Sequence, residues 1–148
     1  MKKNTAWVTG ERAIPTGCSA GDLKAVELTV VIAAGTTHAA ADVVGLGILP
    51  AFHHFVGATL ASDALGAGVT ANVGFVTGAA GAEVVGSELY AAANVAAATC
   101  LPLNSAYALR LPSTEADREI GIKFSADVVA AGNDKLVTLV LLYAASGN

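Results

Sequence analysis

Apolar and polar residues alternate along several segments of this chain, most regularly over residues 118–129. Every second residue there is apolar, and the residues between them are polar, charged or small. Because successive side chains of a β-strand point to opposite faces, this period of two predicts a strand with one face in a core and the other in water. The residues that the pattern places in the core are Ile120, Ile122, Phe124, Ala126 and Val128.

The same pattern predicts further strands over residues 23–34, 43–49, 52–60 and 69–76. The last three follow one another closely, separated by Pro50 and by the turn ALGAG, and carry almost no charge, so we expect a buried β-meander. The residues expected on one face are Phe52, His54, Val56, Ala58 and Leu60 in the middle strand, and Val69, Ala71, Val73 and Phe75 in the third.

The C-terminal run, residues 135–145, is apolar on both faces of the strand that it predicts. A strand of this kind lies either inside a sandwich or at an interface between subunits. If it forms an interface, the residues expected there are Val137, Leu139, Leu141 and Tyr143.

Two other segments have less regular patterns. Residues 89–100 are rich in Ala and fit a short helix or a poor strand, and residues 106–111 predict a short strand before Pro112.

About eight strands separated by turns predict an all-β fold, an antiparallel jelly-roll-like β-sandwich. We expect one sandwich domain over residues 23–148, preceded by an extended N-terminal arm over residues 1–22, where Pro and Gly break any regular element. The apolar residues of the arm cannot bury themselves within it. They are expected to anchor it on a neighbouring subunit or on another external surface, and they are Trp7, Val8 and Ile14.

The composition favours association with other chains. The 148 residues are 54% apolar but only 14% charged, against roughly 25% charged in typical soluble domains. A monomer so poor in charge would expose apolar surface, so we expect a homo-oligomer, a trimer rather than a dimer. The net charge of −4 and the lack of a basic run argue against nucleic-acid binding. No segment has the pattern of a signal peptide or a membrane-spanning helix.

Residues that could support chemistry are few and poorly placed for it. His53 and His54 are adjacent on a strand, so they point to opposite faces and are not expected to bind one metal. The acidic residues Glu115, Asp117 and Glu119 are expected to form a solvated loop with ion pairs to Arg110 or Arg118. The glycine-rich turns match no nucleotide-binding motif. Cys18 and Cys100 are expected to be reduced. We therefore expect no catalytic residues, no metal and no cofactor.

The order of these segments resembles small structural proteins of tailed bacteriophages, of the capsid decoration, cement or head-fibre type. The resemblance rests on IAAGTTHAAADVVGLGILP, on FVGATLASDALGAGVTANVGFVTG, and on the late pair EIGIKFSADVVAAGNDKLVTLVLLYA. In such proteins an apolar strand follows a Leu-Pro step, here Leu49-Pro50, and a strand with a central Gly follows a turn containing Leu-Gly. The resemblance covers roughly residues 23–145, and the jelly-roll-like sandwich that it implies agrees with the strand pattern.

The resemblance implies a virion structural protein that is not an enzyme. It would bind the major capsid protein on the capsid surface after assembly in the host cytoplasm, and as an oligomer it would reinforce the lattice against the pressure of packaged DNA. The alternative is a receptor- or carbohydrate-binding β-sandwich module of a head or tail fibre, for which aromatic residues exposed on loops would be expected. A glycan array separates the two hypotheses, because strong specific binding favours the fibre module.

Overall fold

The computed structural model describes residues 1–5, 8–10 and 22–146. Over these residues the chain forms twelve strands and one short helix. Their bounds are β1 Lys2–Asn4, β2 Leu23–Ile32, β3 Thr36–His38, β4 Val43–Leu49, β5 His53–Ser62, β6 Thr70–Thr77, β7 Val84–Val85, β8 Tyr90–Asn94, β9 Thr99–Pro102, α1 Ala106–Arg110, β10 Arg118–Phe124, β11 Val128–Ala130 and β12 Lys135–Ala145. The all-β prediction is therefore confirmed.

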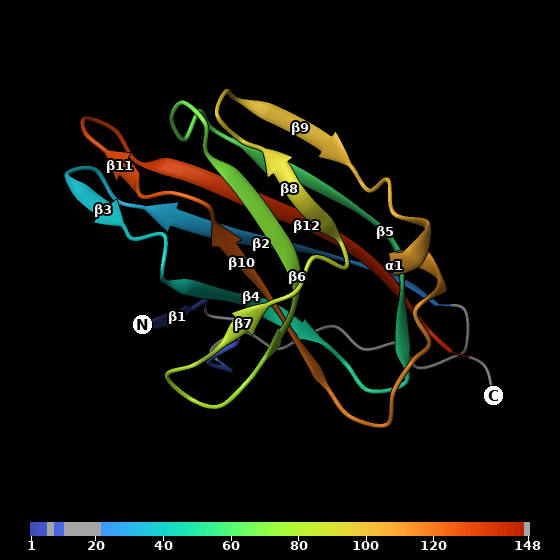
Figure 1. Cartoon of the computed structure of the whole chain (residues 1–148). Coiled ribbons are helices and arrows are strands. Elements are labelled where there is room, and N and C mark those ends of the chain that lie inside the picture. The colour runs from blue at the N-terminus through green and yellow to red at the C-terminus, as the bar shows by residue number, and fades with distance from the viewer. Residues whose placement is uncertain (6–7, 11–21, 147–148) are drawn as a thin grey trace.

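Two sheets face each other as a sandwich (Figure 1). The larger sheet has the strand order β1-β4-β10-β6-β7, with β8 also paired to β6. The other has four strands in the order β2-β12-β5-β9, and a small two-stranded sheet joins β3 to β11. Neighbouring strands are antiparallel except for β1, which is parallel to β4. Strands distant in sequence are thus brought together, as in the pairing of β2 with β12.

The core lies between the inward faces of the two sheets. Ile122, Phe124 and Val128 are buried, as the alternation predicted, and so are Val69, Ala71 and Val73. Phe75 packs against this core, and its ring stacks on that of Phe55 at 5.5 Å between ring centroids. The largest fully buried side chains come from both sheets and include Leu28, Leu46, Leu60, Ile120, Leu139 and Tyr143.

A β-bulge in β5 alters the predicted faces of that strand. Leu142 of β12 pairs with Gly57, but the next residue, Tyr143, pairs with Phe55, so Val56 has no partner. An unpaired residue shifts the alternation by one position. His53 and Phe55 therefore lie on the buried side together with Ala58 and Leu60, whereas Phe52 and Val56 are exposed. The prediction that Phe52, His54 and Val56 share a face with Leu60 is wrong for this reason.

The predicted strand over residues 118–129 is in fact two strands. β10 ends at Phe124, and β11 begins at Val128 in a different sheet. Between them the Ser125 hydroxyl accepts a hydrogen bond from Thr70 N at 3.0 Å, and an Asp127 carboxylate oxygen accepts one from Ala40 N at 2.7 Å. These two bonds tie the segment between the strands to the backbone of residues distant in sequence. Ala126 is consequently exposed rather than in the core.

Residues 106–110 form the helix α1, not the predicted strand. Ser105 caps it, since its hydroxyl accepts a hydrogen bond from Ala108 N at 3.1 Å, and Ala, Leu and Arg favour helix. The ambiguous residues 89–100 are largely extended, in β8 and the start of β9. The Tyr90 hydroxyl donates to Leu101 O at 2.9 Å and so holds these two strands together.

Candidate interaction surface

The outward face of the four-stranded sheet is a broad surface with few charges. Cross-strand register places its side chains in rows, such as Thr29, Thr138, Ala61 and Cys100, followed by Glu27, Val140, Thr59 and Pro102. Thr29 and Thr138 also share a hydrogen bond of 2.9 Å between their hydroxyls. We call this surface the open face. Its residues are Leu23, Ala25, Glu27, Thr29, Val31, Gly57, Thr59, Ala61, Cys100, Pro102, Leu136, Thr138, Val140 and Leu142.

Apolar and hydroxyl side chains dominate the open face, and Glu27 is its one charged residue. Its positions are exposed or half-buried, and the cross-strand pair Val31 and Leu136 is 56% and 44% exposed. A contiguous surface of this composition is typical of a contact with another polypeptide, because water solvates it poorly.

The outward face of the larger sheet differs, because a row of glycines crosses it. Gly45, Gly121 and Gly74 are direct cross-strand partners on β4, β10 and β6. A methyl group on Gly121 would lie 2.5 Å from Val76 Cγ2, and one on Gly74 would lie 2.6 Å from the backbone carbon of Gly86. The missing side chains leave space into which other parts of the chain pack.

The chain itself covers this glycine row. Over Gly45 lie the side chains of Asn4, Val8 and Glu119, and over Gly74 lies Gly86 with the side chain of Glu88. A Glu88 carboxylate oxygen accepts a hydrogen bond from Phe75 N at 3.0 Å, which fixes this covering segment to β6. At these positions the strands of the larger sheet are covered by the chain's own segments, whereas the strands of the open face are uncovered in the described structure, so the open face is the better candidate for a docking surface.

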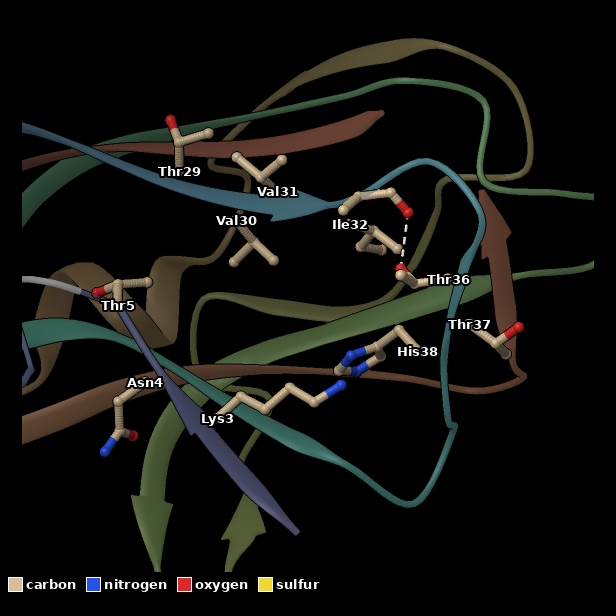
Figure 2. A pocket seen from close by; sticks show the side chains of 11 residues that line it. Lys3, Asn4, Thr5, Thr29, Val30, Val31, Ile32, Thr36, Thr37 and His38 are labelled. Atoms are coloured by element: carbon tan, nitrogen blue, oxygen red, sulfur yellow. Dashed lines mark hydrogen bonds between the residues drawn. The ribbon is translucent and has the colours of Figure 1, made fainter. Parts of the chain in front are cut away.

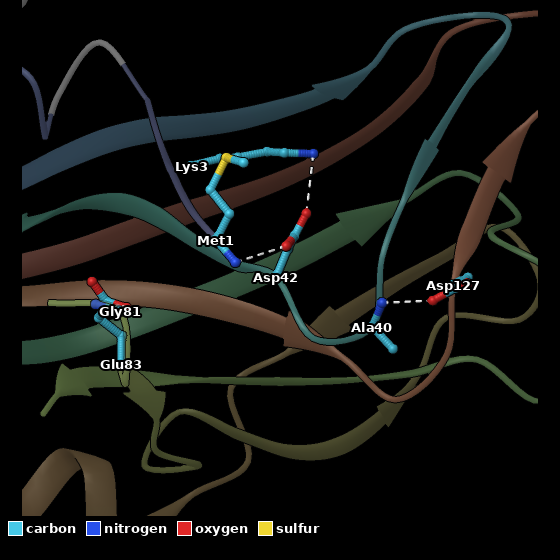
Figure 3. Close-up of polar contacts among 7 residues, drawn as sticks. All are labelled: Met1, Lys3, Ala40, Asp42, Gly81, Glu83 and Asp127. Carbon is cyan, nitrogen blue, oxygen red and sulfur yellow. Dashed lines mark hydrogen bonds and ion pairs between the residues drawn. The ribbon is translucent and has the colours of Figure 1, made fainter.

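The first residues of the predicted arm belong to the sandwich. β1 pairs with β4, and ion pairs hold it there (Figure 3). Asp42 contacts the Met1 amino group at 3.0 Å and Lys3 Nζ at 3.3 Å. Lys2 Nζ contacts Glu119 at 2.6 Å. The Met1 amino group, which donates to Asp42, holds the pKa of that carboxyl below its usual value.

The predicted interface residues lie in several different places. Trp7 and Ile14 are outside the described residues, and Val8 is half-buried beside Gly45. The four from β12 have at most 1% of their surface exposed, so they form the core and another subunit cannot reach them: Val137, Leu139, Leu141 and Tyr143.

The opposite side of β12 carries the outward residues of the open face. Both sides are apolar, so the sequence did not show which one is buried. Lys135 stands at the start of the run, and Thr138 is the polar residue in its interior; the Thr138 hydroxyl is the signal that marks the outward side.

The acidic residues near Arg118 make other contacts than those predicted. Glu119 pairs with Lys2, and Asp117 accepts a hydrogen bond from Ala51 N at 2.7 Å. The Arg118 guanidinium lies 4.5 Å from the centre of the Phe75 ring and donates to His53 O at 3.3 Å.

Within the described part of the chain no three His, Cys, Asp or Glu residues are grouped as metal ligands. None of the described helices has the length and apolarity to cross a membrane.

His38 is a buried histidine in a mixed electrostatic environment. Its ring meets the edge of Phe124 at 5.4 Å between ring centroids. Burial and then the charge of Lys3 lower the pKa of His38 from 6.5, whereas Asp42 and Asp127 act in the opposite direction. The folded protein therefore keeps the imidazole neutral at pH values where the unfolded chain takes up a proton.

We predict a pH dependence of stability that His38 causes. The contribution of its neutral ring is complete above pH 6.5 and is lost as the pH falls from 6.5 through the lower pKa of the folded state. Urea unfolding of the native protein between neutral pH and about pH 5 should show a falling free energy of unfolding. His38→Gln should flatten that slope. Equal slopes in the two proteins would show that His38 does not cause it.

Two solved structures are similar to this chain over nearly its whole length. A chain in the capsid of Ralstonia phage GP4 has 28% sequence identity and a TM-score of 0.86, with 100% of both chains covered. A chain in the capsid asymmetric unit of cyanophage Pam1 has 24% identity and a TM-score of 0.66, with 90% of this chain and 92% of that chain covered, and it shows the fold alone. No protein-family model and no curated protein matches this sequence.

The fold is thus one used by small chains of bacteriophage capsids. The expected resemblance to bacteriophage structural proteins is confirmed, and the similarity supports a structural role in a virion.

Proposed function

We propose that this chain is a capsid decoration protein that binds the major capsid protein on the outer surface of the lattice and reinforces it. The observation that carries the proposal is the open face, a docking surface with one charged residue on a chain whose full length matches a chain of a phage capsid. Its work is mechanical, because apolar area buried across joints between capsid subunits opposes their separation.

The size of the open face suits a contact that is repeated many times. With the 11 residues of β12 as its length, and strands about 4.8 Å apart, the face measures roughly 35 Å by 15–20 Å. That is about 500–700 Å², against about 800 Å² per partner in a standard stable interface. One copy alone would bind modestly. Linked copies on a regular lattice gain affinity from one another, since later contacts form at high effective concentration.

We further propose that the protein is a homo-oligomer, with a trimer favoured over a dimer. Two-fold pairing of the open face on itself, centred on Glu27, would bring two carboxylates together without a cation. A cyclic trimer avoids this and leaves the open face for the capsid protein. Light scattering on the isolated protein at micromolar concentration should give a mass above that of one chain, and a single monomer peak would contradict the oligomer.

The direct test of the docking surface is Val140→Glu. Val140 lies at the centre of the open face, directly opposite Glu27 on β2, so a second carboxylate there must be desolvated when a partner docks. We expect attachment to particles lacking the protein to weaken by tenfold or more, that is by about 1.4 kcal/mol or more. The measurement is co-sedimentation with such particles over a range of protein concentrations.

Val84→Glu is the matched control, because Val84 is an exposed valine on β7, far from the four-stranded sheet in the fold. Thiol labelling gives a second readout in a Cys18→Ser background, since Cys100 is a free, exposed thiol on the open face. It should react in the free protein and be protected on particles. Equal attachment of both variants, with Cys100 still reactive on particles, would refute docking through this face.

The fibre-module alternative has one observation in its favour. Tyr107 on α1 and Phe52 before β5 are 64% and 51% exposed, and exposed aromatic rings are suited to stacking on sugars. Specific binding of the native protein on a glycan array, lost in Tyr107→Ala, would favour that alternative over decoration of the lattice.

A further inference from the structure

A groove of about 430 Å³ runs along one side of the sandwich, beside β2. Its walls come from three strands that belong to three different sheets (Figure 2). They are the end of β1, the second half of β2, and β3. The lining residues are 3–5, 29–33 and 36–38. The groove is separate from the centre of the open face and is not needed for docking through it.

The groove follows the free edge of β2. Five consecutive residues of the chain, 29–33, line it, although Val30 and Ile32 point into the core and Thr29 and Val31 point outward. Consecutive strand residues can all border one groove only where it runs along the strand's edge. Within the described residues β2 is paired with β12 alone, so every second residue of β2 directs its N–H and C=O toward the groove side.

The groove wall also carries a buried polar atom that lacks a partner. His38 is 3% exposed, and its Nε2 has no hydrogen-bond partner in the structure. A buried imidazole nitrogen without a hydrogen-bond partner lowers the stability of the protein. A ligand atom that formed a hydrogen bond with it would remove this cost and so gain binding free energy. Figure 2 shows the ring beside the end of the Lys3 side chain. Lys3 offers hydrogen-bond donors to an anionic group at this end of the groove, and Nε2 of the neutral His38 ring, whose other nitrogen bonds the Asp42 backbone, offers an acceptor.

The charge of the lining is one-sided. Lys3 lines the groove with about half of its side chain exposed, and no Asp or Glu is among the lining residues. Its ion-pair partner Asp42 lies outside the lining. Threonines and Asn4 supply the remaining polar groups, of which Thr36 is bonded to Ala33 O at 2.7 Å and Thr5 to Leu46 O. The groove therefore complements a negatively charged, extended ligand.

We propose that this groove binds an extended, carboxylate-bearing segment of a partner polypeptide, which pairs as an added strand with the free edge of β2. Backbone hydrogen bonds to β2 supply the affinity, and a carboxylate placed against the Lys3 ammonium fixes the register of the strand, while a donor of the same segment can bond His38 Nε2. The added strand fills the gap between the edges of the two sheets at β2 and β1. It gives the protein a second attachment point beside the open face, with Thr29 and Val31 at their shared border.

The test starts from the immobilised full-length protein and a displayed library of random linear peptides. We expect the selected peptides to alternate β-branched residues with others and to contain Asp or Glu. Methylation of alternate backbone nitrogens in a selected peptide should weaken binding by about tenfold or more, because a strand donor is lost at each site. On binding, amide hydrogen exchange should slow in residues 29–33.

Three variants of the protein test whether the carboxylate of the bound peptide contacts Lys3. Lys3→Gln should weaken the selected peptides by about tenfold, whereas Lys24→Gln on the same strand β2 should not, since Lys24 lies outside the groove. Asp42→Asn also removes the ion pair of Lys3, together with the one that Asp42 makes with the Met1 amino group, but it leaves Lys3 free, so it should bind as tightly as the native protein or more tightly. Peptides that bind Lys3→Gln and Asp42→Asn equally weakly would show that only the anchoring of β1 matters.

The proposal is overturned if the library yields no peptide, if the peptides tolerate alternate N-methylation, or if binding leaves the exchange of residues 29–33 unchanged. Because no capsid is present, a failure here leaves docking through the open face untouched. A failure of Val140→Glu to affect attachment likewise leaves this groove untouched.

Discussion

Phe124→Ala is expected to lower the free energy of unfolding by about 3–5 kcal/mol, as removal of a large side chain from a packed core does. Phe124 is 2% exposed, pairs with Ala71 across the strands, and meets the ring of His38 edge-on. Phe124 belongs to the buried core cluster that the two sheets share, so its removal leaves a cavity in that core. Urea unfolding followed by circular dichroism measures the change.

Val129→Ala is the control for this prediction. Val129 lies on β11, close in sequence to Phe124, but it is 54% exposed, so its truncation should change stability by less than about 0.5 kcal/mol. If Phe124→Ala unfolds at the same urea concentration as Val129→Ala, the Phe124 ring does not contribute to the stability of the core, contrary to its burial in the structure.

Gly74→Ala is the second change with a large expected effect. A methyl group there would lie 2.0 Å from a Glu88 carboxylate oxygen, which can move, and 2.6 Å from the backbone carbon of Gly86, which cannot move without its segment. The covering segment would be displaced from β6, and Phe75 N would lose its bond to Glu88. We expect a loss of about 1–3 kcal/mol, the usual cost of overfilling a packed site.

Gly132→Ala is the matched substitution, since nothing lies within 4 Å of a methyl group at that position. It should be close to neutral. Hydrogen exchange provides a local readout, because Gly74→Ala should speed the exchange of the Phe75 amide more than that of amides in β12. Unchanged exchange at Phe75 would mean that the covering segment adapts to the methyl group without leaving.

The sequence pattern predicted the longest strands well. It failed where the structure of a strand depends on the neighbouring strand with which it pairs. β2 buries the alternate side chains that its pattern predicts, because this alternation is a local property of a long strand, and β12 has the predicted bounds. The bulge at Val56 arises from the register of β5 against β12, and no property of Val56 itself announces it.

The same limit applies to the candidate surface. β12 is apolar on both sides, so the choice between Val137 and Val140 as the outward residue is made by the sheet that packs against it. The glycine row joins three strands that are far apart in sequence, and the groove beside β2 joins three segments. Ser105 is different, because a cap before Ala and Leu is a local signal that the strand interpretation overlooked.

The glycine row gives the molecule two unlike sides, and this bears on its use as a display platform. One outward face is closed by the chain's own segments, and the opposite face is open. A protein docked through the open face would turn the closed side toward solvent. The exposed turn between β6 and β7 belongs to that closed side, and Gly81 within it has free space around it. A peptide inserted after Ala80 would then project from the particle, with neither the core nor the docking contact disturbed.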